Sequence, residues 1–157
     1  MTDSRGTPRI GELERPECEA LLTRQQVGRL AFTFRDRVDI APVHYVFANG
    51  RIYGRTRIGA KVGVLAHHPW VAFEVDEIEA LFTWRSVVVH GRVLFPDPDG
   101  APQDQQAFHE GVEAFRRLVP EAFAPGDPTP DRDLVFMIQV HDVSGRSATT
   151  VHGGDAS

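Results

Sequence analysis

The stretch that decides the fold is Val38–Arg57, VDIAPVHYVFANGRIYGRTR. Its first part, Val38–Ala48, is rich in β-branched and aromatic residues, as is typical of a strand. Asn49-Gly50 follows, and both residues accept the positive φ that a type I′ hairpin turn requires. The residues Arg51–Arg57 resume the strand pattern. The segment therefore predicts a β-hairpin with a tight two-residue turn.

Strand and turn signals continue on both sides of this hairpin. Before it, the pattern predicts a helix over Glu12–Arg24, a strand over Val27–Phe34 and a polar turn at 35–37. After it, the pattern predicts a helix over Gly59–His67 and strands over Trp70–Asp76 and Thr83–Phe95, with a bulge or bend at Gly91. It then predicts a helix over Gln103–Val119, a loop over Ala124–Arg132, and strands over Leu134–Val143 and Gly145–Thr150. Six or seven strands joined mostly by short hairpins favour a mainly β (α+β) fold, an antiparallel barrel with a few flanking helices.

Composition limits the class of protein. The chain has 157 residues, which suits one domain, and a net charge of −5, which argues against a surface that coats nucleic acid. No apolar run approaches the roughly 20 residues of a membrane span, and the N-terminus does not resemble a secretory signal. The single cysteine, Cys18, allows no internal disulfide, so a reducing cytoplasm is expected. The polar ends, 1–9 and 151–157, are expected to be flexible around a domain at 10–150.

Four cations cluster just after the hairpin turn of this acidic chain. These are Arg51, Arg55, Arg57 and Lys61. The three arginines have odd numbers and share one face of the predicted strand, while Lys61 lies in the first turn of the next helix, where free N–H groups favour an anion. With the hydroxyl of Thr56, the cluster predicts a phosphate-binding cradle. The alternative is a solvated strand face whose arginines pair with aspartates, such as Asp36, Asp39 or Asp76.

Two further strands carry side chains suited to a planar ligand. On the strand from Trp84 to Gly91, Trp84 and Ser86 share one face, which offers a flat aromatic ring and a hydroxyl group. The alternative is that Trp84 fills the core. His44 lies in mid-strand beside Pro42, and a proline in a strand frees backbone groups for a ligand. The alternative for His44 is a strand histidine without a chemical role.

Motifs for other kinds of chemistry are missing from the sequence. The seven histidines show no zinc-binding spacing, so no metal site is expected. The chain lacks the nucleophile elbow, the P-loop and the dinucleotide fingerprint. Any reaction is therefore expected to depend on a cofactor.

Four sequence runs, taken in order, resemble a known family. They are PVHYVF at 42–47, NGRIYGRTRIGAK at 49–61, HPWVAFEVD at 68–76 and WRSVVVHGRV at 84–93. Together they are similar to the pyridoxamine 5′-phosphate oxidase-related flavin-binding split barrels, and most similar to the nitroimidazole-reductase-like branch. The resemblance covers Glu12–Arg146. It implies a six-stranded antiparallel split β-barrel that forms a homodimer and binds FMN at the subunit interface.

The resemblance also implies site residues. The FMN phosphate would be held by Arg55, Thr56 and Lys61. The isoalloxazine ring would lie along two strands, with contacts from Pro42, Val43, His44, Trp84, Arg85, Ser86 and Val87. In this arrangement His44 would donate a hydrogen bond or a proton near the reactive edge of the ring.

Two departures bear on the expected reaction. The C-terminal SGRSATTVHGGDAS, at 144–157, does not match the segment with which the oxidase holds pyridoxal phosphate, and Ala60 stands where the oxidase commonly has a second cation. We therefore expect an FMN-dependent oxidoreductase that passes electrons or hydride to a small organic acceptor, such as a nitro-aromatic compound, rather than an oxidase of vitamin B6. The alternatives are a deazaflavin- or haem-binding protein on the same barrel, or a non-catalytic flavin-binding module.

Overall fold

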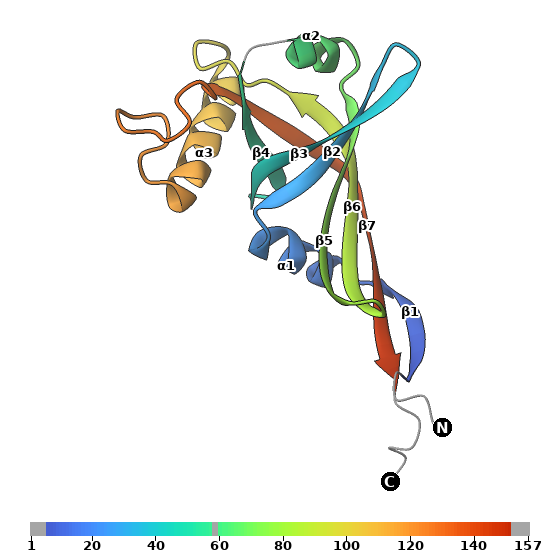
Figure 1. The fold of residues 1–157 in the computed structure, drawn as a ribbon. Coiled ribbons are helices and arrows are strands. Elements are labelled where there is room, and N and C mark those ends of the chain that lie inside the picture. The colour runs from blue at the N-terminus through green and yellow to red at the C-terminus, as the bar shows by residue number, and fades with distance from the viewer. Residues whose placement is uncertain (1–5, 58–59, 152–157) are drawn as a thin grey trace.

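The structure, a computed structural model, describes residues 6–57 and 60–151 (Figure 1). Within them lie ten elements: β1 (Thr7–Leu13), α1 (Arg15–Arg24), β2 (Val27–Phe34), β3 (Arg37–Ala48), β4 (Arg51–Thr56), α2 (Ala60–His67), β5 (Trp70–Ala80), β6 (Thr83–Leu94), α3 (Pro102–Leu118) and β7 (Leu134–Val151). The strands form one antiparallel sheet in the order β1-β7-β4-β3-β2-β5-β6, and β7 also pairs with β6. Six strands therefore close into a ring, which agrees with the predicted split barrel.

The two hairpin turns before β4 follow the sequence prediction. Asn49 and Gly50 have φ angles of 55° and 72°, as a type I′ turn requires. Arg35 and Asp36 also have positive φ, at 48° and 56°, and connect β2 to β3. Each turn has only two residues between its strands, so the turns themselves fix the register of β2, β3 and β4.

The strand β7 is continuous over Leu134–Val151, where the sequence pattern predicted two shorter strands. No break occurs at the predicted boundary between Val143 and Gly145, and Gly145 is instead a point of close approach, because an added Cβ there would lie 2.6 Å from the Cys18 sulfur on α1. The irregularity predicted at Gly91 of β6 is present, since the register between β6 and β7 shifts between His90 and Gly91, but the extra residue is His141 of β7.

Residues 7–9 belong to a strand, although the sequence analysis assigned them to a flexible end. The strand β1 pairs with the second half of β7, from Thr7 opposite Val151 to Leu13 opposite Gly145. Because β7 extends past its pairing with β4, its edge would otherwise stay open, and β1 covers it. For the same reason α1 begins at Arg15 rather than at Glu12.

Alternation along the strands produces two separate cores. Inside the ring, Tyr45 and Phe73 are fully buried and meet edge to face, with ring centroids 4.9 Å apart. The two ends of the ring are closed by α1, through Leu21, and by α2, through Leu65 (Figure 1). Outside the ring, α3 packs on β4 and β7 around Tyr53 and forms the second core.

The outer face of β3, β2, β5 and β6 is not covered by α3. Side chains at alternate positions of β3 and β5 point outward there, because their neighbours fill the ring. Four of them are large, apolar and exposed: Val38 (74%), Ile40 (67%), Trp70 (60%) and Ile78 (69%). We call this surface the uncovered face. In the described part of the chain, no helix is both long and apolar enough to span a membrane.

Candidate functional site

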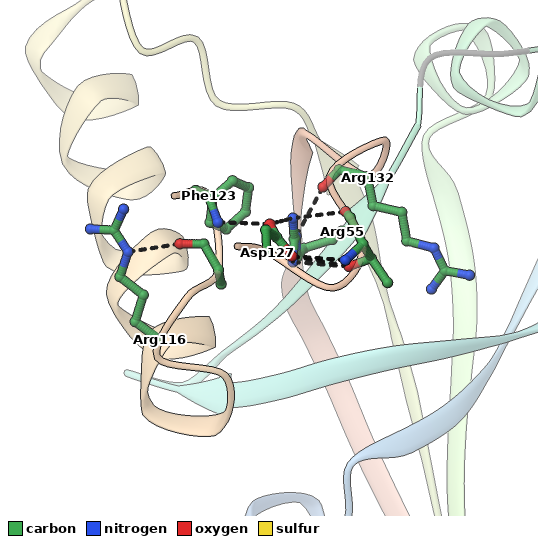
Figure 2. A network of polar contacts seen from close by, with 7 residues as sticks. Arg55, Arg116, Phe123, Asp127 and Arg132 are labelled. Atoms are coloured by element: carbon green, nitrogen blue, oxygen red, sulfur yellow. Dashed lines mark hydrogen bonds and ion pairs between the residues drawn. The ribbon is translucent and has the colours of Figure 1, made fainter. Parts of the chain in front are cut away.

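Arg55 lies at the centre of a polar network between β4 and the loop that precedes β7 (Figure 2). Its odd position directs it to the outer side of the ring, toward α3 and that loop. The guanidinium is 7% exposed and its N–H groups reach five acceptors. Nε donates to the backbone oxygen of Arg132 at 2.9 Å. The terminal nitrogens donate to both carboxylate oxygens of Asp127 and to the hydroxyl and carbonyl oxygens of Thr129, at 2.6–3.4 Å.

Asp127 completes this network from the loop. Its carboxylate is 3% exposed and lies 2.6 Å from Arg55. It also accepts hydrogen bonds from the backbone N–H groups of Phe123 (2.8 Å) and Thr129 (2.9 Å). The hydrogen bonds from Arg55 first, and then those from the backbone, hold the pKa of Asp127 well below its usual range. The ring of Phe123 lies 4.0 Å from the Arg55 guanidinium carbon, so the loop covers Arg55 from that side.

The arginines of the predicted phosphate cradle are paired with acidic side chains. Arg51 and Arg55 do share one face of β4, as predicted, but each is paired with an acidic residue. Arg51 lies 3.3 Å from Glu110 of α3, and Arg57 lies 3.8 Å from Asp131 of the loop. The acidic partners differ from the aspartates considered from sequence because α3 and the loop pack on this side of β4. An arginine has five N–H donors, so in this arrangement Arg55 has none left for a phosphate.

The other two members of the predicted cradle stand apart from this network. The Thr56 hydroxyl is close to solvent and donates to the backbone oxygen of Arg57 at 3.3 Å. Lys61 lies in α2, but its side chain is outside the described part of the structure. Thr56 and Lys61 therefore remain predicted phosphate ligands, whereas Arg55 has a structural role in this arrangement.

A pocket of about 410 Å³ opens beside Arg55. It forms where β3 and β4 separate, because their ladder ends at the pair Tyr45–Gly54, one residue before His44 and Arg55. The polar side chains that line it include Gln26, His44 and Arg132, and its apolar wall comes from the end of α3 and from the loop. The structure thus brings together two residues that the sequence analysis assigned to different parts of the site, His44 and Arg55. We call this the α3 pocket.

The side chains predicted to contact a ring alternate in direction, as the sequence predicted. Pro42 points to the uncovered face and is exposed, whereas Val43 packs on the core inside the ring. On β6, Val87 is fully buried inside the ring, so a ligand on the outer surface could reach only its backbone. Arg85 lies 3.2 Å from Glu77, which also binds Arg24 of α1.

Trp84 and Ser86 share the uncovered face with Pro42 but do not meet it. Pro42 of β3 lies opposite Arg29 of β2, and Arg29 lies opposite Glu74 of β5, so two strands separate Pro42 from β6. Polar side chains occupy the two strands between them. Arg29 of β2 binds Glu74 of β5 at 2.7 Å, and the Ser86 hydroxyl of β6 donates to the same carboxylate at 2.9 Å. Within one chain, the two sets of expected ring contacts, on β3 and on β6, therefore lie apart.

Asp127 and Arg132 belong to this region, although neither was predicted from the sequence. The run Asp-Pro-Thr at 127–129 was a usable signal, because an aspartate that binds the backbone N–H two residues later forms an Asx turn. Its pairing with Arg55 was not visible, because the two residues lie 72 positions apart. Among the described residues, no group of three or more His, Cys, Asp or Glu side chains is placed to hold a metal ion.

Comparison with known proteins agrees with this architecture. The family model described as pyridoxamine 5′-phosphate oxidase matches residues 14–147, which is most of the chain. The chain belongs to the pyridoxamine 5′-phosphate oxidase family. This match spans the ring, α3 and the loop that carries Asp127, so the α3 pocket lies within the family domain.

Three known proteins are similar to this chain over most of its length. Protein RA0666 of Rhizobium meliloti is 27% identical over 146 residues, which cover 87% of this chain and 93% of that protein. A crystal structure of an FAD-binding protein from Mesorhizobium loti is 28% identical, with a TM-score of 0.69 over 89% of this chain and 99% of that one. A candidate 5-nitroimidazole antibiotic resistance protein of Bacteroides thetaiotaomicron shares the fold, with 14% identity and a TM-score of 0.68 over 90% of this chain and 89% of that one.

Proposed function

We propose that this protein binds FMN between two copies of the chain and acts as an oxidoreductase on a small organic acceptor. The observation that carries the proposal is family membership over residues 14–147, together with an FAD-binding relative of known structure at 28% identity. Bound flavin would supply hydride or electron transfer, chemistry for which no side chain of this protein substitutes. Nitro-aromatic compounds are the acceptors to test first, because the chain resembles the nitroimidazole-reductase-like branch.

The residues present fit a flavin at the outer surface of the ring. Pro42 and the ring of Trp84 offer flat surfaces on the uncovered face. The phosphate would be held by Thr56, at the exposed end of β4, and by Lys61 in the first turn of α2, where unpaired backbone N–H groups favour an anion. Arg55 would support this site by holding the end of β4 in place through its hydrogen bonds to the loop before β7. His44, exposed at the mouth of the α3 pocket, would donate a hydrogen bond or a proton near the ring.

The dimer is part of the proposal because the two sets of expected ring contacts lie apart within one chain. Pro42 and Trp84 lie on strands separated by β2 and β5. The exposed apolar side chains of the uncovered face are of the kind that a protein–protein interface buries. A second copy packed on this face would bring Pro42 of one chain near Trp84 of the other and would bury Ile40 and Trp70.

The visible spectrum of the purified protein tests the proposal directly. We expect the absorption bands of oxidised flavin, and mass spectrometry of the released ligand should identify FMN. A haem spectrum or a deazaflavin mass would replace FMN with that cofactor. Bound flavin that NAD(P)H cannot reduce, with or without a reductase, would favour a non-catalytic flavin-binding module. Protein that carries no flavin and takes up none when FMN is added would remove the proposal.

Lys61 offers a sharper test of the phosphate site because it is the only lysine in the sequence. An amine-reactive reagent can label only Lys61 and the α-amino group, so mass spectrometry can follow each separately. We expect FMN to protect Lys61 and to leave labelling of the α-amino group unchanged. Riboflavin, which lacks the phosphate, is the matched control and should protect Lys61 less. Equal labelling with and without FMN would exclude Lys61 from the phosphate site.

A further inference from the structure

The α3 pocket has the features of a second ligand site, which shares only His44 and Arg55 with the predicted ring and phosphate contacts. Its volume of about 410 Å³ suits a small molecule. It is the place where the end of α3, the proline-containing loop and the diverging ends of β3 and β4 meet. Of the residues named for flavin binding, only His44 and Arg55 line it.

The charged side chains that line the pocket are both arginines, Arg55 and Arg132, although the protein is acidic overall. None of the described residues that line it is an aspartate or a glutamate. The nearby Asp127 is neutralised by Arg55 at 2.6 Å, and Asp131 faces Arg57 at 3.8 Å. The guanidinium of Arg132 is exposed and has no hydrogen bond or ion pair with any residue that the structure describes. It is therefore free to bind an anion.

The backbone of Arg132 is held firmly while its side chain is free. Its N–H group donates to the Thr129 oxygen at 3.1 Å, and its own carbonyl oxygen accepts the Arg55 Nε hydrogen bond at 2.9 Å. Figure 2 shows the Arg132 side chain extending away from this network. The network around Arg55 thus fixes the position from which Arg132 reaches the pocket, which lowers the entropy lost when a ligand binds.

The opposite wall of the pocket is apolar. Phe115 and Leu118 of α3 line it, together with Pro128 of the loop. Leu118 is 43% exposed, although it lies on a helix whose other large apolar side chains pack against β4 and β7. A ligand with an apolar body would bury this side chain and gain the corresponding hydrophobic free energy.

We propose that the α3 pocket binds a small organic anion whose carboxylate pairs with Arg132 and whose aromatic or branched body rests on Phe115 and Leu118. Gln26 and His44 provide further hydrogen-bond donors at the same opening. The proposal concerns binding alone and goes beyond the proposed flavin chemistry. The two are tested separately, because a carboxylate can bind whether or not flavin is present.

The test is a calorimetric titration of the full chain with benzoate, before and after FMN is added. We expect benzoate to bind, and benzamide, its neutral counterpart of nearly the same shape, to bind at least tenfold more weakly. Arg132→Ala should weaken benzoate binding at least tenfold, as expected for loss of a charged hydrogen bond, while Arg132→Lys should retain part of the affinity. Arg117→Ala is the matched control, because Arg117 is an exposed arginine of α3 that does not line the pocket.

A second variant guards against an effect on folding. Leu118→Glu changes an exposed wall residue and places a negative charge in the pocket, so it should also abolish benzoate binding while thermal unfolding stays unchanged. Absence of benzoate binding, or binding that Arg132→Ala leaves unchanged, would overturn the inference. So would inorganic phosphate that binds with the same dependence on Arg132 while benzoate does not bind, because the pocket would then be a phosphate site.

Discussion

Arg55 of β4 and Asp127 of the loop before β7 lie 72 residues apart in the sequence, yet their side chains meet at 2.6 Å and are almost fully buried. The pair ties the segment between α3 and β7 to the outer side of the ring. That segment forms one wall of the α3 pocket, so the pair also shapes the pocket. Replacing either partner leaves the other buried without its counter-charge, which is strongly destabilising in proteins.

Asp127→Ala is therefore expected to lower the melting temperature and to expose the loop at 120–133 to proteolysis. The reason is that the variant removes the acceptor for two Arg55 nitrogens and two backbone N–H groups. Thermal unfolding and limited trypsin digestion measure the two effects. Asp131→Ala is the matched control, because its pair with Arg57 is 63% and 77% exposed and should contribute little. Equal behaviour of the two variants would contradict the structural role of Asp127.

Stability is expected to fall as the pH is lowered through about 4 and below. The folded state holds the pKa of Asp127 well below its ordinary value, so at these pH values the unfolded chain binds a proton that the folded chain does not. Glu77, whose pKa is lowered chiefly by the hydrogen bond from Arg24, acts in the same direction. The stabilisation is fully present above the ordinary carboxyl pKa and is lost on acidification. Urea unfolding at several pH values should therefore show a shallower acid dependence in Asp127→Asn than in the parent protein.

Gly54→Ala is expected to destabilise the protein by about 1–3 kcal/mol through overpacking. A Cβ at this position of β4 would lie only 2.0 Å from the ring of Phe136 on β7. Gly63→Ala is the matched control in α2, since no described atom lies within 4 Å of its added Cβ. This second change should stabilise by about 0.5–1 kcal/mol, because alanine is the better helix former. Chemical denaturation of both variants gives the comparison, and a neutral Gly54→Ala would contradict the packing.

Ile40→Glu is expected to prevent dimer formation and, with it, flavin binding. The change places a charge on the uncovered face, where Ile40 is 67% exposed in one chain and would be buried in the proposed dimer. Light scattering after size exclusion reports the mass, and FMN titration reports the site. Val151→Glu changes an apolar residue that is 42% exposed at the end of β7 and should leave both unchanged. A dimeric Ile40→Glu variant would place the interface elsewhere.

His44→Gln is expected to keep the flavin but to lower turnover roughly 100-fold or more if His44 supplies a proton. Glutamine retains a hydrogen-bond donor at this exposed position on β3 but cannot transfer a proton near neutral pH. Steady-state reduction of a nitro-aromatic acceptor by NAD(P)H measures the rate, and the flavin spectrum shows whether the site is occupied. Full activity in His44→Gln would leave His44 with a binding role only.

The hairpin and the ring could be predicted because their signals are local. Asn49-Gly50 fixes the turn, and alternation around Tyr45 and Val87 fixes which side chains enter the core. Two features could not be predicted because they depend on distant partners. The strand β1 forms only because β7 offers it an edge. Gly145 is part of a continuous strand, although the sequence predicted a strand boundary there, because the absence of a side chain lets Cys18 approach closely.

The candidate site divides in the same way. The prediction that Arg51 and Arg55 share a face followed from strand geometry and is confirmed, but their acidic partners on α3 and the loop were set by tertiary packing. His44 and Arg55 were assigned to different parts of the site because they lie on different strands. They line one pocket because the β3–β4 ladder ends just before them.

The position of β7 has a consequence for how the molecule reaches its folded state. It follows the other described elements in the sequence, and it pairs with β1, β4 and β6, which are made earlier. During synthesis, β4 and β6 therefore each have one unpaired edge until β7 has left the ribosome. The ring cannot close before then. Contacts of such long sequence separation form slowly, so the nascent chain depends on β7 to cover these edges and protect it from aggregation.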